Sequence, residues 1–176
     1  MKTRRAGSMI AALSALALAL AGCGYSLVGR ASNLPPEVRR VYVKPLENRT
    51  PRSQVEQILT RAIADELLTR QRFVVVNDPA AADAELSGAV VGFGVTPVTF
   101  DPDGRATEYE ISITARMLFR RAASDDVLWS NERYQFRESY PVEVSESGYF
   151  DRENLAIEEV AGHFAETMVS DLLEGF

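Results

Sequence analysis

Alternation of apolar and polar residues between Tyr109 and Arg120 constrains the fold more than any other feature of this chain. The odd-numbered positions are apolar: Tyr109, Ile111, Ile113, Ala115, Met117 and Phe119. The polar residues interleaved with them are Glu110, Ser112, Thr114, Arg116 and Arg120. Because successive side chains of a strand point to opposite faces, this pattern predicts a strand with one apolar and one polar face. A sheet built around it needs helices on one face, and its other face meets water or a partner.

Two further segments have the apolar spacing of amphipathic helices. The first follows Thr50 and Pro51, which we expect as N-cap and first helical residue, although Ser53 and Glu56 offer a capping box in a second register. Its apolar stripe comprises Val55, Ile58, Leu59, Ala62, Ile63 and Leu67. The second helix spans residues 152–173, and its stripe comprises Leu155, Val160, Phe164, Met168, Leu172 and Leu173. Each helix is therefore expected to pack through one face.

Short apolar runs at 41–43 and 73–76 flank the first helix, so they predict parallel strands joined by a right-handed crossover. Residues 84–100 predict a long strand that bends or bulges at its glycines, Gly88, Gly92 and Gly94. Turns at 101–104 and 122–126 precede the alternating strand and a hairpin partner at 127–136. We therefore predict an α+β fold, a two-layer sandwich in which two helices pack on one face of a four- to five-stranded mixed sheet.

The N-terminal segment is typical of an export signal. Lys2, Arg4 and Arg5 precede an uncharged Ala/Leu-rich run from Met9 to Ala21, which is shorter than the ~20 residues of a membrane-spanning helix. The run ends in Leu20-Ala21-Gly22-Cys23, which resembles the lipobox of bacterial lipoproteins. That resemblance implies cleavage before Cys23 and acylation of Cys23, the lipidation site. The alternative is a buried core cysteine behind an ordinary signal.

The domain boundaries follow from this reading. Residues 1–22 are the expected lipoprotein signal peptide, residues 23–37 a lipidated tether that contains Pro35-Pro36, and residues 38–176 a single domain. Gly24, where a retention aspartate would stand in lipoproteins kept in the inner membrane, favours the periplasmic face of the outer membrane as the location.

Charge and composition exclude several function classes. The chain carries 19 basic and 25 acidic residues, and loss of three basic residues with the signal would take its net charge from −6 to about −9. Such an acidic surface is unsuited to nucleic acid. One cysteine and one histidine exclude the usual zinc and Cys–His sites. We therefore expect no catalytic residue, no metal and no cofactor.

The remaining motifs each have a plain structural interpretation. Gly92-Phe93-Gly94 lacks the third glycine of a dinucleotide fingerprint and indicates a bulge. His163 is expected on a helix flank, and Trp129 in core or edge packing, with partner contact as the alternative. The pairs Arg39-Arg40 and Arg120-Arg121 indicate solvated edges, with phosphate binding as the alternative because guanidinium groups suit phosphate geometry.

One ordered set of segments covers nearly all of the chain that follows the signal. It opens with Cys23-Gly24-Tyr25-Ser26-Leu27-Val28-Gly29, Leu34-Pro35 and the segment 41–50. It continues through residues 84–100, Leu128-Trp129-Ser130, the stretch from Tyr134 to Tyr140 and the C-terminal helix. Together these segments resemble the LptE family, the lipopolysaccharide-assembly lipoproteins.

The resemblance implies two helices on a four-stranded sheet and a lipoprotein that plugs the LptD β-barrel, supports its assembly and helps lipopolysaccharide reach the cell surface. Strand geometry makes Thr114, Arg116 and Arg120 the candidate contacts for that barrel or for lipopolysaccharide. The competing hypothesis is a lipid-anchored periplasmic regulator of a cell-wall enzyme or secretion pore.

Overall fold

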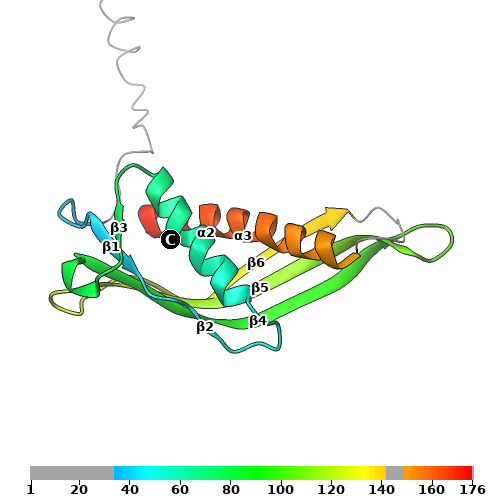
Figure 1. The fold of residues 1–176 in the computed structure, drawn as a ribbon, viewed down its shortest axis with the longest axis horizontal. Helices are drawn as coiled ribbons and strands as arrows, with labels where there is room; N and C mark the ends of the chain where they lie inside the picture. Colours follow the sequence, from blue (N-terminus) through cyan, green and yellow to red (C-terminus); the bar gives the residue numbers. More distant parts are fainter. Residues whose placement is uncertain (1–33, 142–148, 176) are drawn as a thin grey trace, which may run out of the picture. The chain divides into compact units, whose positions relative to one another are not determined.

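Two helices lie on the same side of a mixed six-stranded sheet (Figure 1). The computed structural model describes residues 34–141 and 149–175, which belong to one compact unit, Ser32–Phe176. The predicted α+β sandwich is confirmed, with six strands rather than four or five. No helix among the described residues is long and apolar enough to cross a membrane.

The sheet joins a parallel half to an antiparallel half. Strands β1 (Arg40–Val43) and β3 (Val74–Val76) pair in parallel, as the apolar runs predict, and β1 and β2 (Glu47–Asn48) each pair in parallel with β4 (Ala84–Phe100). Strands β4, β5 (Ala106–Arg121) and β6 (Val127–Pro141) then form an antiparallel meander. The expected irregularity in β4 is present, because its register against β5 shifts between Val90 and Gly92.

Helix α2 (Val55–Thr69) begins later than either predicted register. Its N-cap is Gln54, which has a left-handed backbone with φ of 68° and makes no side-chain capping bond. The expectation of Thr50 or Ser53 at this position was wrong because Asn48 holds the preceding turn. Its Oδ1 accepts hydrogen bonds from the backbone N–H and hydroxyl of Thr50, and its Nδ2 donates to Glu56 at 2.8 Å.

The core lies between the helices and the sheet. Leu59, Ile63 and Leu67 of α2 are fully buried where this helix packs on β1 to β4, and truncating such a leucine to alanine typically costs ~2–5 kcal/mol. In α3 (Tyr149–Glu174) the buried stripe carries two adjacent residues per turn: Ala156, Ile157, Val160, Ala161, Phe164, Ala165, Met168, Val169 and Leu172. Leu155 was expected in this stripe, but it is 64% exposed because its side of α3 faces away from the sheet.

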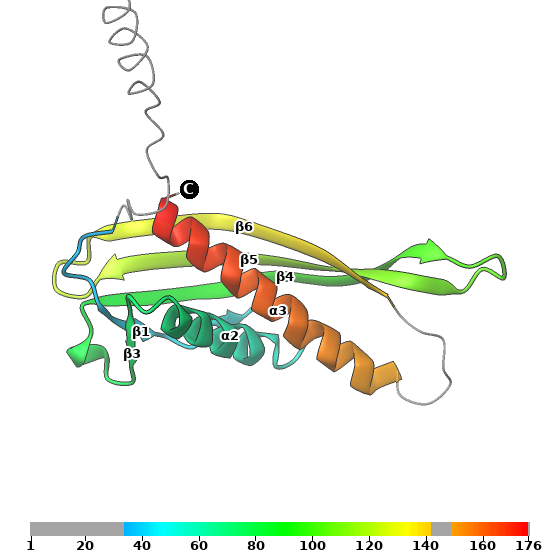
Figure 2. The same ribbon diagram turned by 90° about the horizontal axis from the view of Figure 1, so that it is seen from above.

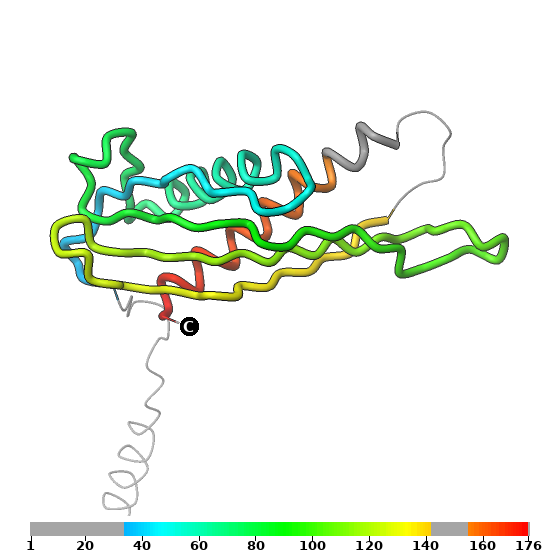
Figure 3. Tube along the Cα trace, turned by 90° about the horizontal axis from the view of Figure 1, so that it is seen from below, coloured from blue at the N-terminus to red at the C-terminus, as the bar shows by residue number. Residues whose placement is uncertain are grey.

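The helices run in the same general direction and lie side by side, and α3 crosses diagonally above β4, β5 and β6 (Figure 2). Arg70, which follows α2, donates to the Ser170 hydroxyl of α3 at 2.8 Å and so links the two helices. The β4–β5 hairpin extends beyond the helix layer (Figure 3). Val98 and Phe100 in this extension are 46% and 57% exposed.

Candidate interaction surface

We call the side of the sheet opposite α2 and α3 the open face. The apolar residues of β5 from Ile111 to Phe119 point toward the helices and are buried. The intervening residues Ser112, Thr114, Arg116 and Arg120 therefore lie on the open face, as the alternation predicts. Leu118 shares this face but is half-buried.

The three candidate contact residues occur on this face, but both arginines already have acidic partners. Arg116 Nε lies 2.8 Å from Glu132 Oε2. Arg120 lies 3.2 Å from Glu85 and 3.0 Å from Asp125. A phosphate group would therefore have to compete with these carboxylates for the guanidinium donors.

Thr114 has a different environment, formed by two glycines of β4. A Cβ atom placed on Gly92 would lie 3.2 Å from the Thr114 Cβ, and one placed on Gly94 would lie 2.9 Å from the Ser112 Oγ. Small residues at these positions thus leave room for the polar side chains of β5. The centre of the open face consequently presents the hydroxyl groups of Ser112 and Thr114.

Strand β2 extends the paired charges of the open face. Glu47 is opposite Ala89 of β4 and accepts a hydrogen bond from Arg49 at 2.7 Å. The neighbouring Arg49 lowers the pKa of Glu47, and the positive charges of Lys44 and Arg116 act in the same direction.

Arg137 is a basic residue of the open face that sequence reasoning missed. It lies on β6 opposite Ser112, is exposed, and forms no ion pair with another residue in the described ranges. The predicted strand ended at Phe136, whereas β6 continues to Pro141. Extending the hairpin pairing by a few residues would have placed Arg137 beside the predicted polar face.

The helix-facing side of β6 is tied to α3 by two polar contacts. Tyr134 is buried, and its hydroxyl donates a hydrogen bond to Asp171 at 2.9 Å. Burial is the main cause of the raised pKa of Tyr134, and the hydrogen bond to Asp171 is the second cause. His163 Nδ1 lies 2.7 Å from Glu138 Oε1, and this contact raises the pKa of His163, as do the charges of Glu159 and Glu166. His163 therefore lies on the flank of α3, as expected.

The arginine pairs and Trp129 have structural contacts. Arg40 forms an ion pair with Asp83 at 2.7 Å, and Arg121 lies 3.2 Å from Glu37. Trp129 is 6% exposed and packs edge-to-face with Tyr134 in the core. The interpretation of Trp129 as a packing residue is thus confirmed.

Cys23, the expected lipidation site, and the signal segment lie outside the described residues. Within residues 34–141 and 149–175, no three His, Cys, Asp or Glu side chains are grouped so that they could hold a metal ion. Leu34, which precedes the expected domain boundary at Val38, is buried in the core.

Comparison with known proteins relates this fold to bacterial lipoproteins. Rare lipoprotein B from Shewanella oneidensis superposes with a TM-score of 0.50 and 16% identity, over 76% of this chain and 93% of that protein. A putative lipoprotein from Caulobacter crescentus gives a TM-score of 0.50 at 16% identity, over 73% and 88% of the two chains. A hypothetical protein from Chlamydia trachomatis gives 0.53 at 10% identity, over 79% and 97%. These similarities show a shared fold.

Sequence comparison is more specific about the family. No curated protein matches the chain. The model of a family described as LptE, lipopolysaccharide-assembly, matches residues 38–172, which include every strand and α2 and nearly all of α3. The chain therefore belongs to the LptE family of lipopolysaccharide-assembly proteins.

Proposed function

We propose that this LptE-family protein is a non-catalytic outer-membrane lipoprotein that assists assembly of an LptD-type β-barrel, occupies its lumen, and takes part in lipopolysaccharide transport to the cell surface. The family match over residues 38–172 carries the proposal. The partners in this proposal are the barrel, lipopolysaccharide and the membrane.

The open face supports occupancy of a barrel lumen. The interior walls of large outer-membrane barrels are polar and enclose water. The open face presents hydroxyl groups from Ser112 and Thr114, and its charged groups Arg116 and Arg120 are paired with carboxylates. Such a surface can lie against a wet polar wall, where the unpaired charge of Arg137 also stays in contact with water.

Lipidation of Cys23 would hold the domain at the periplasmic face of the membrane. Two or more acyl chains make such an anchor nearly permanent, at about 0.8 kcal/mol for each buried methylene. Roughly ten residues separate Cys23 from the buried Leu34, and at ~3.3–3.6 Å for each residue they span at most about 40 Å. That length allows the domain to enter a barrel opening while its anchor stays in the inner leaflet.

Arg116, Arg120 and Thr114 remain the proposed lipopolysaccharide or barrel contacts, and Arg137 joins them. Guanidinium groups bind phosphate through paired hydrogen bonds. Arg137 is exposed and has no acidic partner among the described residues, so no carboxylate there competes with a phosphate for its guanidinium group.

Affinity purification of the full-length lipoprotein in mild detergent tests this function. The proposal predicts that an LptD-type barrel co-elutes with the wild-type protein. Recovery of a cell-wall enzyme or a secretion pore in its place would contradict the proposal and favour a periplasmic regulator. The Cys23→Ala variant serves as the control for the anchor, because it should leave the outer-membrane fraction unless the barrel retains it.

A further inference from the structure

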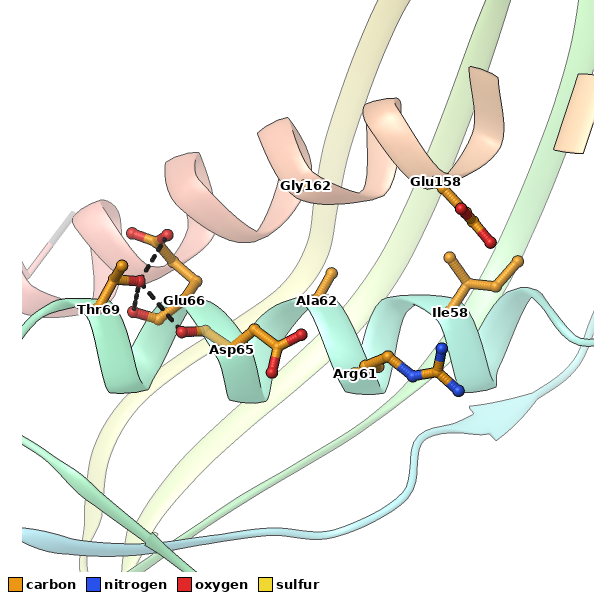
Figure 4. A pocket seen from close by; sticks show the side chains of 8 residues that line it. All are labelled: Ile58, Arg61, Ala62, Asp65, Glu66, Thr69, Glu158 and Gly162. Atoms are coloured by element: carbon orange, nitrogen blue, oxygen red, sulfur yellow. Dashed lines mark hydrogen bonds between the residues drawn. The ribbon is translucent and has the colours of Figure 1, made fainter. Parts of the chain in front are cut away.

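An outward-facing groove separates α2 from α3 on the side of the helix layer that faces away from the sheet. It encloses about 410 Å³, within the ~300–1,000 Å³ range of binding pockets. Ile58 and Ala62 of α2 form its apolar floor, and Gly162 of α3 lies across from Ala62 (Figure 4). Both walls of the groove belong to helices whose other sides are buried in the core.

Gly162 has no structural explanation within the described fold. Glycine is the poorest helix former after proline, and this residue lies in the middle of a 26-residue helix. A Cβ atom built on Gly162 would have no neighbouring atom within 4 Å. The described part of the chain therefore leaves room for a side chain at this position. Glycine does, however, allow the backbone of another molecule to approach closely.

The walls of the groove are predominantly acidic. Asp65 and Glu158 are exposed and form no ion pair with another described residue, whereas Glu66 is neutralised by Arg70 at 2.7 Å. Arg61 is the basic residue among those that line the groove.

We propose that a basic segment of the barrel partner docks in this groove, with its backbone against Gly162 and basic side chains toward Asp65 and Glu158. The charge of the walls selects a basic segment, since complementary charges set specificity in protein interfaces. The inference rests on the proposed function, because it assigns one contact surface to the same partner.

Substitution of Gly162 separates a docking role from a purely structural one. In the full-length lipoprotein, Gly162→Ala should raise the melting temperature by a few degrees, since alanine favours the helix and meets no neighbour. In the mild-detergent affinity purification, the same variant should recover at least fivefold less barrel than the wild-type protein. Thr167→Ala is the matched control: Thr167 is exposed on α3 and does not line the groove, so this change should also favour the helix but leave barrel recovery unchanged.

Charge reversal provides the second variant. Glu158→Lys should reduce barrel recovery at least fivefold with little change in melting temperature, because Glu158 is exposed and makes no ion pair in the described structure. Reduced recovery in both variants supports the inference. Undiminished recovery in either variant overturns it while leaving the proposed function intact. Absence of the barrel from the wild-type eluate overturns the proposed function and this inference with it.

Discussion

Asp83 is expected to hold the start of the sheet together through its carboxylate. One oxygen accepts hydrogen bonds from the backbone N–H groups of Arg39 and Arg40 at 3.1 and 2.7 Å, and the other accepts from the Arg40 guanidinium at 2.7 and 3.2 Å. These bonds connect the beginning of β1 to the residue that precedes β4. Asp83→Asn removes the negative charge while keeping the shape of the side chain.

The size of the effect follows from the pKa of Asp83. Hydrogen bonds from Arg40, first from its side chain and then from its backbone, lower this pKa from 3.8 to about 2. At ~1.36 kcal/mol for each pKa unit, the shift corresponds to about 2 kcal/mol. The Arg40 side chain is 55% exposed, and solvent screening reduces the contribution. We therefore expect Asp83→Asn to lower the free energy of unfolding by about 1–2 kcal/mol at pH 7.

The pH dependence has a definite sign. A carboxyl group whose pKa is lower in the folded state stabilises the protein above its unfolded pKa, and this stabilisation disappears as the pH falls through the folded value. The difference between wild type and Asp83→Asn should thus be largest above pH 4 and shrink toward pH 2.

Urea denaturation of the Cys23→Ala background at several pH values measures this difference. Asp65→Asn is the control, because the Asp65 side chain is exposed and makes no ion pair with a described residue. A difference below about 0.3 kcal/mol at pH 7, or one that persists unchanged at pH 2, would refute the reasoning.

Three further predictions concern the contacts of β6 and the open face. His163→Gln should destabilise the protein by less than about 1 kcal/mol, because the His163 and Glu138 side chains are 49% and 30% exposed. Since the pKa of His163 is raised on folding, this loss should be full below about pH 6.5 and vanish as the pH rises through the folded value, as denaturation at pH 5.5 and 8.5 would show. Tyr134→Phe should cost about 1–2 kcal/mol in the same assay, because it removes the bond to Asp171; no change would mean that this bond contributes nothing. Arg116→Glu should alter thermal stability by less than about 1 kcal/mol, since its ion pair is exposed, and a loss of several kcal/mol would show that the open face is buried.

Periodicity in the sequence was sufficient to predict most of the secondary structure. The alternation in β5 and the apolar stripe of α2 reflect burial on one side, which is a local property of a strand or helix. For the same reason, the alternation placed Thr114, Arg116 and Arg120 on the open face.

Features that depend on distant contacts could not be predicted in this way. The start of α2 depends on Asn48, whose side chain holds the preceding turn, and β2 has only two residues and forms through pairing with β4. Leu155 is apolar and close to helical register, yet the direction in which α3 crosses the sheet leaves it exposed. Arg116 pairs with Glu132 of β6, and Arg120 pairs with Glu85 of β4 and with Asp125, which precedes β6. These partners are distant in the sequence or lie outside β5, so the alternation within β5 did not reveal them.

Depletion of the protein in cells tests the central claim most directly. If the protein assists assembly of an LptD-type barrel and lipopolysaccharide transport, depletion should leave the barrel poorly folded, reduce lipopolysaccharide at the cell surface, and make cells permeable to large antibiotics. Expression of the wild-type protein should restore all three properties. Normal barrel folding and normal surface lipopolysaccharide after depletion, together with altered cell-wall synthesis or secretion, would contradict the account.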